Sequence, residues 1–242
     1  MKGLKKIFEG NNYVVYRSNG TEFVSNAIKK GFFIESNGVL YDKKGRRVII
    51  TQSDFFHYPR LVGNCGGSVF GVNGHYVFTN WHVASCTDTL DMGNSNYYMV
   101  SWIKEYKPRI MPMWLIELLG LLGIEVVSRY DFAVGYISGN YFYIPYGKHA
   151  LILTAGNCRD SDDLNCLNIA LEVPYSSPIP NGYRVRVECN YWGYEATEEV
   201  IDIGSALVNY GNGYALLKPA YLLKPIDKSA IPGCSGSAVI PG

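Results

Sequence analysis

Short runs rich in Val, Ile, Tyr and Phe recur along the whole chain, with Gly, Asn, Pro or Ser residues between them. The runs cover residues 13–16, 47–50, 68–70, 76–78, 132–137, 183–187 and 214–217. Strands of this length and spacing are typical of an all-β sandwich or barrel and argue against βαβ units. At 242 residues, the chain is long enough to bury a core in one such unit or two.

The segment 68–78 has the pattern of a tight hairpin. Asn73 and Gly74 lie between its two apolar halves, and this residue pair supplies the two positive φ angles of a type I′ turn. A softer boundary lies at residues 138–140, where one series of strands ends. We interpret it as the join between two β-barrels.

The net charge of the chain and its N-terminal residues restrict its expected partners and location. The formal net charge is +1, and the basic residues are scattered, so we expect no nucleic-acid partner. Residues 1–9 are basic but no apolar stretch follows them, so they do not form a secretory signal. A cytoplasmic or virus-associated location is therefore favoured.

One long apolar stretch covers residues 110–127. Pro112, Glu117, Gly120, Gly123 and Glu125 interrupt it, so we expect no membrane span. Residues 113–122 are predicted to form about two helical turns. We expect these turns to pack against the body of the protein; a lid that touches a membrane is the alternative.

Three residues capable of acyl-transfer chemistry follow one another along the chain. His82 lies in Thr-Asn-Trp-His-Val (79–83), just past an apolar strand, and Asp131 immediately precedes another. Ser235 lies in Gly-Cys-Ser-Gly-Ser (233–237). Glycines on both sides of a serine allow a sharp turn that exposes its hydroxyl and directs successive N–H groups at one point.

In this order, the three residues resemble the catalytic triad of chymotrypsin-like (trypsin-like, PA clan) serine proteases. Residues 79–83 look like the Thr-Asn-x-His-Val of HtrA-like and glutamyl-endopeptidase-like bacterial enzymes. Residues 226–237 look like their pre-serine segment, and viral chymotrypsin-like proteases are also similar. The resemblance implies an all-β fold of two six-stranded-type antiparallel barrels. It also implies a serine endopeptidase that acts on protein or peptide substrates without a cofactor.

The resemblance assigns a role to each residue of the motif. Ser235 is the nucleophile, His82 the general base and acid, and Asp131 the residue that orients His82. The backbone N–H groups of Gly233 and Ser235 form the oxyanion hole. The base of the substrate pocket, formed by the segment Ser229-Ala230, carries no strong charge.

The chain departs from the family pattern at two places. Cys234 stands where trypsin-like enzymes have an aspartate, so activation of the trypsin kind is not expected. Cys234 is also an alternative nucleophile, as in viral cysteine relatives, but the expected following glycine comes after Ser235. Only seven residues follow Ser235, so we expect the second barrel to be incomplete at the C-terminus or to be filled by another segment.

The cysteines suggest two cross-links. The positions of Cys65 and Cys86 resemble the disulfide that clamps the histidine loop of trypsin-like enzymes. Cys158 and Cys166 bracket an acidic loop, where a local disulfide is favoured over a metal site because no histidine lies nearby. No metal site is expected.

These interpretations divide the chain into three parts. Residues 1–60 are an N-terminal extension with β-hairpins, 61–140 a barrel with His82 and Asp131, and 141–242 a second barrel with Ser235. Two other functions stay open. One is a catalytically inactive structural or binding module, such as a viral or surface component, and the other, a minor one, is a self-cleaving polyprotein domain.

Overall fold

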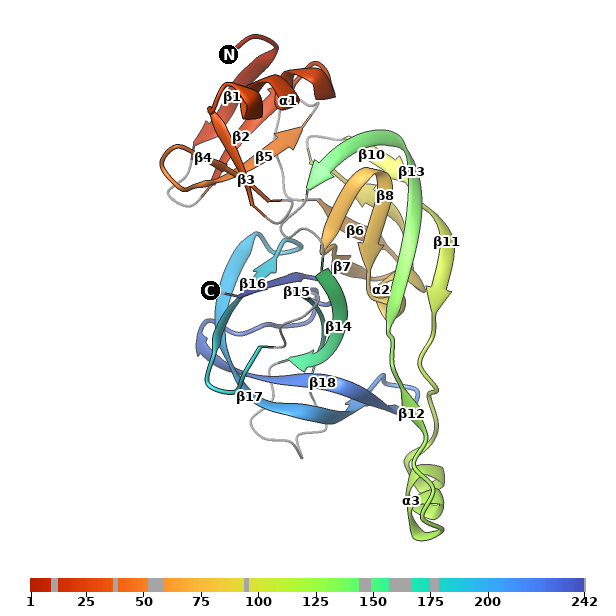
Figure 1. The fold of residues 1–242 in the computed structure, drawn as a ribbon. Helices are drawn as coiled ribbons and strands as arrows, with labels where there is room; N and C mark the ends of the chain where they lie inside the picture. Colours follow the sequence, from red (N-terminus) through yellow and green to blue (C-terminus); the bar gives the residue numbers. More distant parts are fainter. Residues whose placement is uncertain are drawn as a thin grey trace.

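A computed structural model of the protein describes residues 1–9, 13–36, 39–51, 59–93, 96–143, 149–156, 167–174 and 179–241. Most of the secondary structure of these residues is β-strand, arranged in curled sheets (Figure 1). The predicted all-β fold class is confirmed. None of the helices in these ranges is long and apolar enough to cross a membrane.

The N-terminal part of the chain is a five-stranded sheet with one helix. The strand order is β1-β2-β5-β4-β3, and Ala27 of the helix joins Val14, Tyr16 and Phe33 in a small core. The helix was not expected from the sequence. The elements are β1 Leu4–Glu9, β2 Tyr13–Ser18, α1 Thr21–Lys29, β3 Phe33–Ser36, β4 Val39–Asp42 and β5 Arg47–Thr51.

Two further sheets enclose a second core. Their strand orders are β10-β9-β6-β7 and β11-β13-β8. Leu61 and Leu90 from the first sheet pack with Val77 and Ile137 from the second. The elements are β6 Arg60–Gly63, β7 Gly66–Ser68, β8 Gly71–Thr79, α2 Trp81–Ala84, β9 Thr87–Asp91, β10 Tyr97–Met99, β11 Ser101–Tyr106 and β13 Phe132–Tyr143.

The two halves of the segment 68–78 do meet, because the Phe70 N–H donates to the Phe78 carbonyl at 3.0 Å, but the type I′ turn expected at residues 73–74 is wrong. Gly74 has a positive φ of 66°, but Asn73 does not, and a type I′ turn needs both. β8 instead runs through this position and pairs with β13 on both sides of an irregularity between Tyr136 and Tyr141. Pairing with a neighbouring strand therefore overrides the local turn preference.

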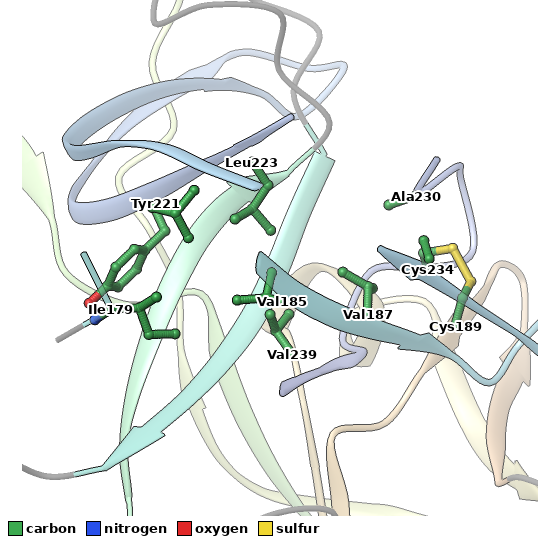
Figure 2. Close-up of a cluster of buried hydrophobic side chains, with 11 residues drawn as sticks. Ile179, Val185, Val187, Cys189, Tyr221, Leu223, Ala230, Cys234 and Val239 are labelled. Carbon is green, nitrogen blue, oxygen red and sulfur yellow. Dashed lines mark hydrogen bonds between the residues drawn. A yellow bond between two sulfur atoms is a disulfide. The ribbon is translucent and has the colours of Figure 1, made fainter. Parts of the chain in front are cut away.

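The fourth sheet contains the remaining strands, in the order β15-β14-β18-β17-β16-β19, with β12 paired to β18. The sheet curls so that β15 lies against β19 (Figure 1). Figure 2 shows its core, where Val185 and Val187 of β16 lie beside Val239 of β19. The elements are β12 Val127–Ser128, β14 His149–Gly156, β15 Leu167–Pro174, β16 Arg184–Cys189, β17 Tyr194–Asn209, β18 Tyr214–Asp227 and β19 Ala238–Pro241.

Buried polar contacts join the three parts of the molecule. The carboxylate of Glu188, on β16, accepts hydrogen bonds from the guanidinium of Arg47, on β5, and from the hydroxyl of Tyr143, on β13. Burial and the Glu188 carboxylate together raise the pKa of Tyr143 well above its ordinary value. The predicted domain boundaries after residues 60 and 140 stay a prediction.

The predicted helix in the apolar stretch forms as α3, Met113–Leu121, but its expected packing is wrong. None of its residues is buried, and Figure 1 shows it at the tip of an extension away from the sheets. We call residues 112–126 the arm. Both limbs of the arm are held at its base by β18, because Met111 pairs with Tyr214 and Val127 with Leu216.

Candidate active site

His82 and Asp131 are brought together by two neighbouring strands. β8 ends at Thr79, just before the short helix α2 that carries His82, and Thr79 pairs with Ala133 near the start of β13. His82 Nδ1 lies 2.7 Å from Asp131 Oδ2, and the His82 backbone N–H donates to Asp131 Oδ1 at 3.0 Å. The Asp131 side chain is fully buried, whereas the His82 side chain is 26% exposed.

This contact fixes the protonation pattern of the imidazole. An ionised carboxylate can only accept hydrogen bonds, so Nδ1 of His82 donates its proton to Asp131. Nε2 of the neutral ring is then unprotonated and can accept a proton. The pair therefore has the tautomer that a general base needs.

Two residues that the sequence analysis missed complete the surroundings of Asp131. The hydroxyl of Tyr210, between β17 and β18, donates to Asp131 Oδ2 at 2.9 Å, and its ring packs edge-on against the His82 ring. Asn80 Nδ2 donates to the backbone carbonyl of Asp131 at 2.7 Å. The sequence offers no signal for Tyr210, one of 20 tyrosines, whereas Asn80 stands two positions before His82.

The loop that carries Ser235, residues 231–237, lies between β18 and β19 and is bonded to the part of the molecule that carries His82. The Ser68 N–H donates to the Ser235 carbonyl at 2.9 Å, and Ser68 Oγ donates to the Gly233 carbonyl at 3.0 Å. The Gly236 N–H donates to Asn80 Oδ1 at 2.7 Å. Because Asn80 also contacts Asp131, it connects the serine loop to the His82–Asp131 pair.

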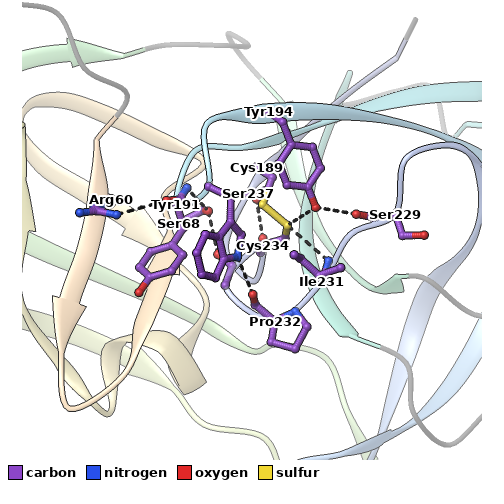
Figure 3. The surroundings of a disulfide bond; sticks show 12 residues. Arg60, Ser68, Cys189, Tyr191, Tyr194, Ser229, Ile231, Pro232, Cys234 and Ser237 are labelled. Carbon is purple, nitrogen blue, oxygen red and sulfur yellow. Dashed lines mark hydrogen bonds between the residues drawn. A yellow bond between two sulfur atoms is a disulfide. The ribbon is translucent and has the colours of Figure 1, made fainter.

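The orientation of the peptide between Pro232 and Gly233 is fixed by an indole. Trp192 Nε1 donates to the Pro232 carbonyl at 2.7 Å (Figure 3). The N–H of a trans peptide points away from its carbonyl, so the Gly233 N–H points away from this contact. The N–H groups of Gly233 and Ser235 donate to none of the described residues.

Gly233 itself cannot be replaced without strain. Its φ is 101°, and a Cβ atom there would lie 2.6 Å from both Trp192 Nε1 and Tyr191 Cδ1. Both the backbone conformation and the space thus require glycine at this position.

A disulfide between Cys189 and Cys234 ties the loop to the end of β16 (Figure 3). Both cysteines are fully buried. The sulfur of Cys234 is therefore not a free nucleophile, which removes the alternative to Ser235. The sequence shows the unusual position of Cys234 but gives no sign of its partner.

The residues converge on one open cavity of about 480 Å³, which is lined by His82, Tyr210, Gly233 and Ser235, among others. Among the described residues, no hydrogen bond joins Ser235 Oγ to His82 Nε2. Contacts of this kind are often long in unliganded sites and shorten when substrate binds.

Comparisons with known proteins identify no family. No protein-family model matches the sequence, and a search of curated proteins finds no match. The chain is similar to a crystal structure of the inactive form of the Rv3671c protease, with a TM-score of 0.38, 13% identity, and coverage of 76% of this chain and 71% of that one. A mutant of Rv3671c from M. tuberculosis, also in an inactive form, gives a TM-score of 0.36, 14% identity, and 76% and 70% coverage. Similarity at this level supports no conclusion about activity.

The predicted substrate-pocket residues do not line this cavity. The Ser229 carbonyl accepts a hydrogen bond from the Tyr194 hydroxyl at 2.5 Å, and Ala230 is buried in the core of the fourth sheet. Their role in substrate binding stays a prediction. The lining of the cavity includes instead Trp81, Ile110, Val208, Asn209 and Asn212.

One of the two cross-links suggested by the sequence lies within the described residues. A disulfide joins Cys65 and Cys86, and both residues line the cavity beside His82. Cys158 and Cys166 lie outside the described residues. Within the described ranges, no group of three or more His, Cys, Asp or Glu residues is placed to hold a metal ion.

Proposed function

We propose that this protein is a serine endopeptidase that hydrolyses peptide bonds through an acyl-enzyme on Ser235. The observation that carries the proposal is the shared cavity. It joins a histidine already oriented by a buried carboxylate, a serine hydroxyl, and a loop with two N–H groups that donate to no described residue. These are the parts that acyl transfer requires.

Under this proposal, the reaction begins with acylation of the serine. Ser235 Oγ attacks the carbonyl carbon of the scissile bond while His82 Nε2 takes the hydroxyl proton. The carbonyl oxygen becomes an oxyanion, which accepts hydrogen bonds from the Gly233 and Ser235 N–H groups. A single donor of this kind contributes about 3 kcal/mol to transition-state stabilisation.

Collapse of the tetrahedral intermediate breaks the C–N bond. The protonated His82 gives its proton to the departing amine, which leaves an ester between the substrate acyl group and Ser235. A water molecule then attacks the ester with His82 again as the base. The products are a carboxylic acid and the free Ser235 hydroxyl.

Asp131 and Tyr210 act through His82. The Asp131 carboxylate holds Nδ1–H and stabilises the imidazolium that forms in each half of the reaction. The Tyr210 hydroxyl in turn holds the same carboxylate oxygen. Tyr210 is therefore proposed as a positioning residue.

The test is labelling of the whole chain with a fluorophosphonate probe, which bonds covalently to an activated serine. We expect modification of Ser235, identified by mass spectrometry, and loss of labelling in His82→Ala. Ser85→Ala is the matched control, because Ser85 lines the same cavity and its hydroxyl donates to the His82 carbonyl at 2.9 Å. A folded chain that is never labelled, or labelling that survives His82→Ala, would rule out the proposal.

A catalytically inactive binding module is the second candidate. The missing hydrogen bond between Ser235 Oγ and His82 Nε2 favours it. Under this alternative, a peptide binds in the cavity but is not cut and the probe does not react. Peptide binding by Ser235→Ala together with unlabelled wild-type protein would support this function, whereas labelled wild-type protein would exclude it.

A further inference from the structure

The arm exposes an apolar face that nothing in the described protein covers. Trp114, Leu118 and Leu121 follow one another at positions i, i+4 and i+7 of α3, so they lie on one side of the helix. Their exposed fractions are 64%, 47% and 86%. A cluster of large exposed apolar side chains on a projecting element marks a docking surface, whereas single scattered apolar residues on a surface do not.

The apolar surface continues past the end of the helix. Leu122 is 67% exposed, and Ile124 is 49% exposed on the returning limb. The helix has nine residues, so it is about 13 Å long, less than half the thickness of a hydrocarbon core of about 30 Å. An element of this length can enter one face of a bilayer but not cross it.

Cationic side chains surround the base of the arm. The Arg109 N–H donates to Ser128 Oγ at 2.8 Å, which places Arg109 and Arg129 at the same level on the two limbs. Both side chains are exposed, and neither forms an ion pair with a described residue. Lys107 is exposed nearby. Negatively charged phosphate groups are the electrostatic complement of these side chains.

Two tyrosines lie at the same level as the arginines. The rings of Tyr106 and Tyr130 are 5.4 Å apart and their side chains are partly exposed. Tyrosine is enriched where hydrocarbon meets water, because its ring is apolar and its hydroxyl is polar. The arm therefore has an apolar tip, then tyrosines and cations, in the order in which a bilayer presents acyl chains and phosphates.

We propose that the arm docks on an anionic lipid surface. The Trp114–Leu118–Leu121 face enters the boundary between acyl chains and headgroups, and Arg109 and Arg129 contact lipid phosphates. An apolar socket in a protein would explain the tip but not Arg109 and Arg129 behind it, which form no ion pair with a described residue. Glu117 and Glu125 are exposed on the arm, and their negative charges oppose docking on anionic lipid. Removing these charges should therefore strengthen lipid binding, whereas removing the arginines should weaken it.

Docking would hold the candidate active site close to the lipid surface. Ile110, at the base of the arm, lines the cavity, and Met111 pairs with Tyr214 beside it. The substrates reached would then be segments of membrane-associated proteins near the headgroups. This last step rests on the proposed function, whereas lipid binding by the arm does not.

The test is flotation of the full chain with vesicles of phosphatidylcholine alone or mixed with phosphatidylglycerol. We expect binding to the mixed vesicles and its loss in the double variant Leu118→Glu, Leu121→Glu. Removing two cations in Arg109→Gln, Arg129→Gln should weaken binding to mixed vesicles by about 30-fold. Glu117→Gln with Glu125→Gln should strengthen it.

Ile34→Glu is the matched control, because Ile34 is 55% exposed on β3, far from the arm in the fold (Figure 1). It should leave flotation unchanged. An unchanged melting temperature in each variant shows that the chain is folded, and fluorophosphonate labelling reports separately on the active site. The proposal is overturned if neither vesicle binds or if Leu118→Glu, Leu121→Glu binds normally. A self-associated chain that this variant dissociates, without vesicle binding, would also overturn it and assign the face to a second copy.

Discussion

The serine loop and the arm both lie next to β18, yet they differ in almost every contact. The loop follows the end of β18 and is held by Ser68, Asn80, Trp192 and a disulfide. The arm leaves the body beside the start of β18 and is bonded only at its base among the described residues. Small residues build the loop, whereas large apolar residues build the arm.

This difference separates two ways in which an irregular segment can serve a function. Catalysis needs groups that are held within a fraction of an ångström. The backbone groups of the loop accordingly form hydrogen bonds with the body of the protein. A docking element needs an apolar surface that the protein itself does not cover. Variants in each segment and in the strands around them test how firmly the loop is held and how free the arm is.

Loss of the Cys189–Cys234 disulfide should have the largest effect on stability. The bond closes a loop with a sequence separation of 45, and a loop of that size corresponds to about 4 kcal/mol in the chain-entropy account. Urea unfolding of Cys189→Ala, Cys234→Ala measures the loss. Cys65→Ala, Cys86→Ala is the matched control, with a separation of 21 and an expected loss of about 3 kcal/mol.

The same variant distinguishes the two regions. It should reduce labelling of Ser235 but leave vesicle binding by the arm unchanged. If labelling persists at the wild-type rate, the hydrogen bonds of Ser68 and Asn80 alone hold the loop.

Glu198 lies on β17, in the same sheet as the strands that flank the serine loop, and its side chain lacks the contacts that hold the loop. Its side chain is buried on β17, its carboxylate oxygens have no hydrogen-bond partner in the part of the chain that the structure describes, and burial raises its pKa from 4.5 to about 7. The folded state therefore keeps the proton that the unfolded state has already lost, so the free energy of unfolding falls as the pH rises from about 4.5 to about 7.

Glu198→Gln should remove this loss. The variant should gain about 3 kcal/mol relative to wild type above pH 7, and the gain should shrink towards zero below about pH 4.5. Urea unfolding at several pH values measures it, with Glu199→Gln on the same strand as the control. A gain independent of pH would mean that Glu198 does not titrate in this range.

Tyr210→Phe should slow the reaction without weakening substrate binding. A hydrogen bond to a charged group contributes about 1.5–3 kcal/mol, so losing the contact with Asp131 Oδ2 should lower kcat by at least about tenfold. KM should stay the same if Tyr210 acts through Asp131. A rise in KM at unchanged kcat would instead make Tyr210 a substrate contact, and Tyr136→Phe, on the exposed side of β13, is the control.

The two regions also differ in how far the sequence predicts them. The order of His82, Asp131 and Ser235 is readable because short motifs surround each residue. Tyr210 is not readable, because a hairpin between β17 and β18 brings it to Asp131 from 79 positions away. The Cys189–Cys234 pairing is not readable either, since six cysteines allow 15 connectivities.

The arm shows the opposite limit. Its apolar residues correctly predicted a helix, but they did not predict whether that helix is buried or exposed. A short helix without a distinct polar face fits the interior of a protein or an external apolar surface equally well. Only the placement of α3 beyond the sheets separates these two outcomes.

The smallest effect is expected in the arm itself. Leu118→Glu with Leu121→Glu should change the free energy of unfolding by less than about 0.5 kcal/mol, because surface substitutions remove no buried contact. Leu223→Ala is the comparison, since Leu223 is fully buried in the fourth sheet and its truncation should cost about 2–5 kcal/mol. A comparable loss in the arm variant would mean that α3 packs on the body in solution. The apolar face would then be part of a core and could not serve as a docking surface.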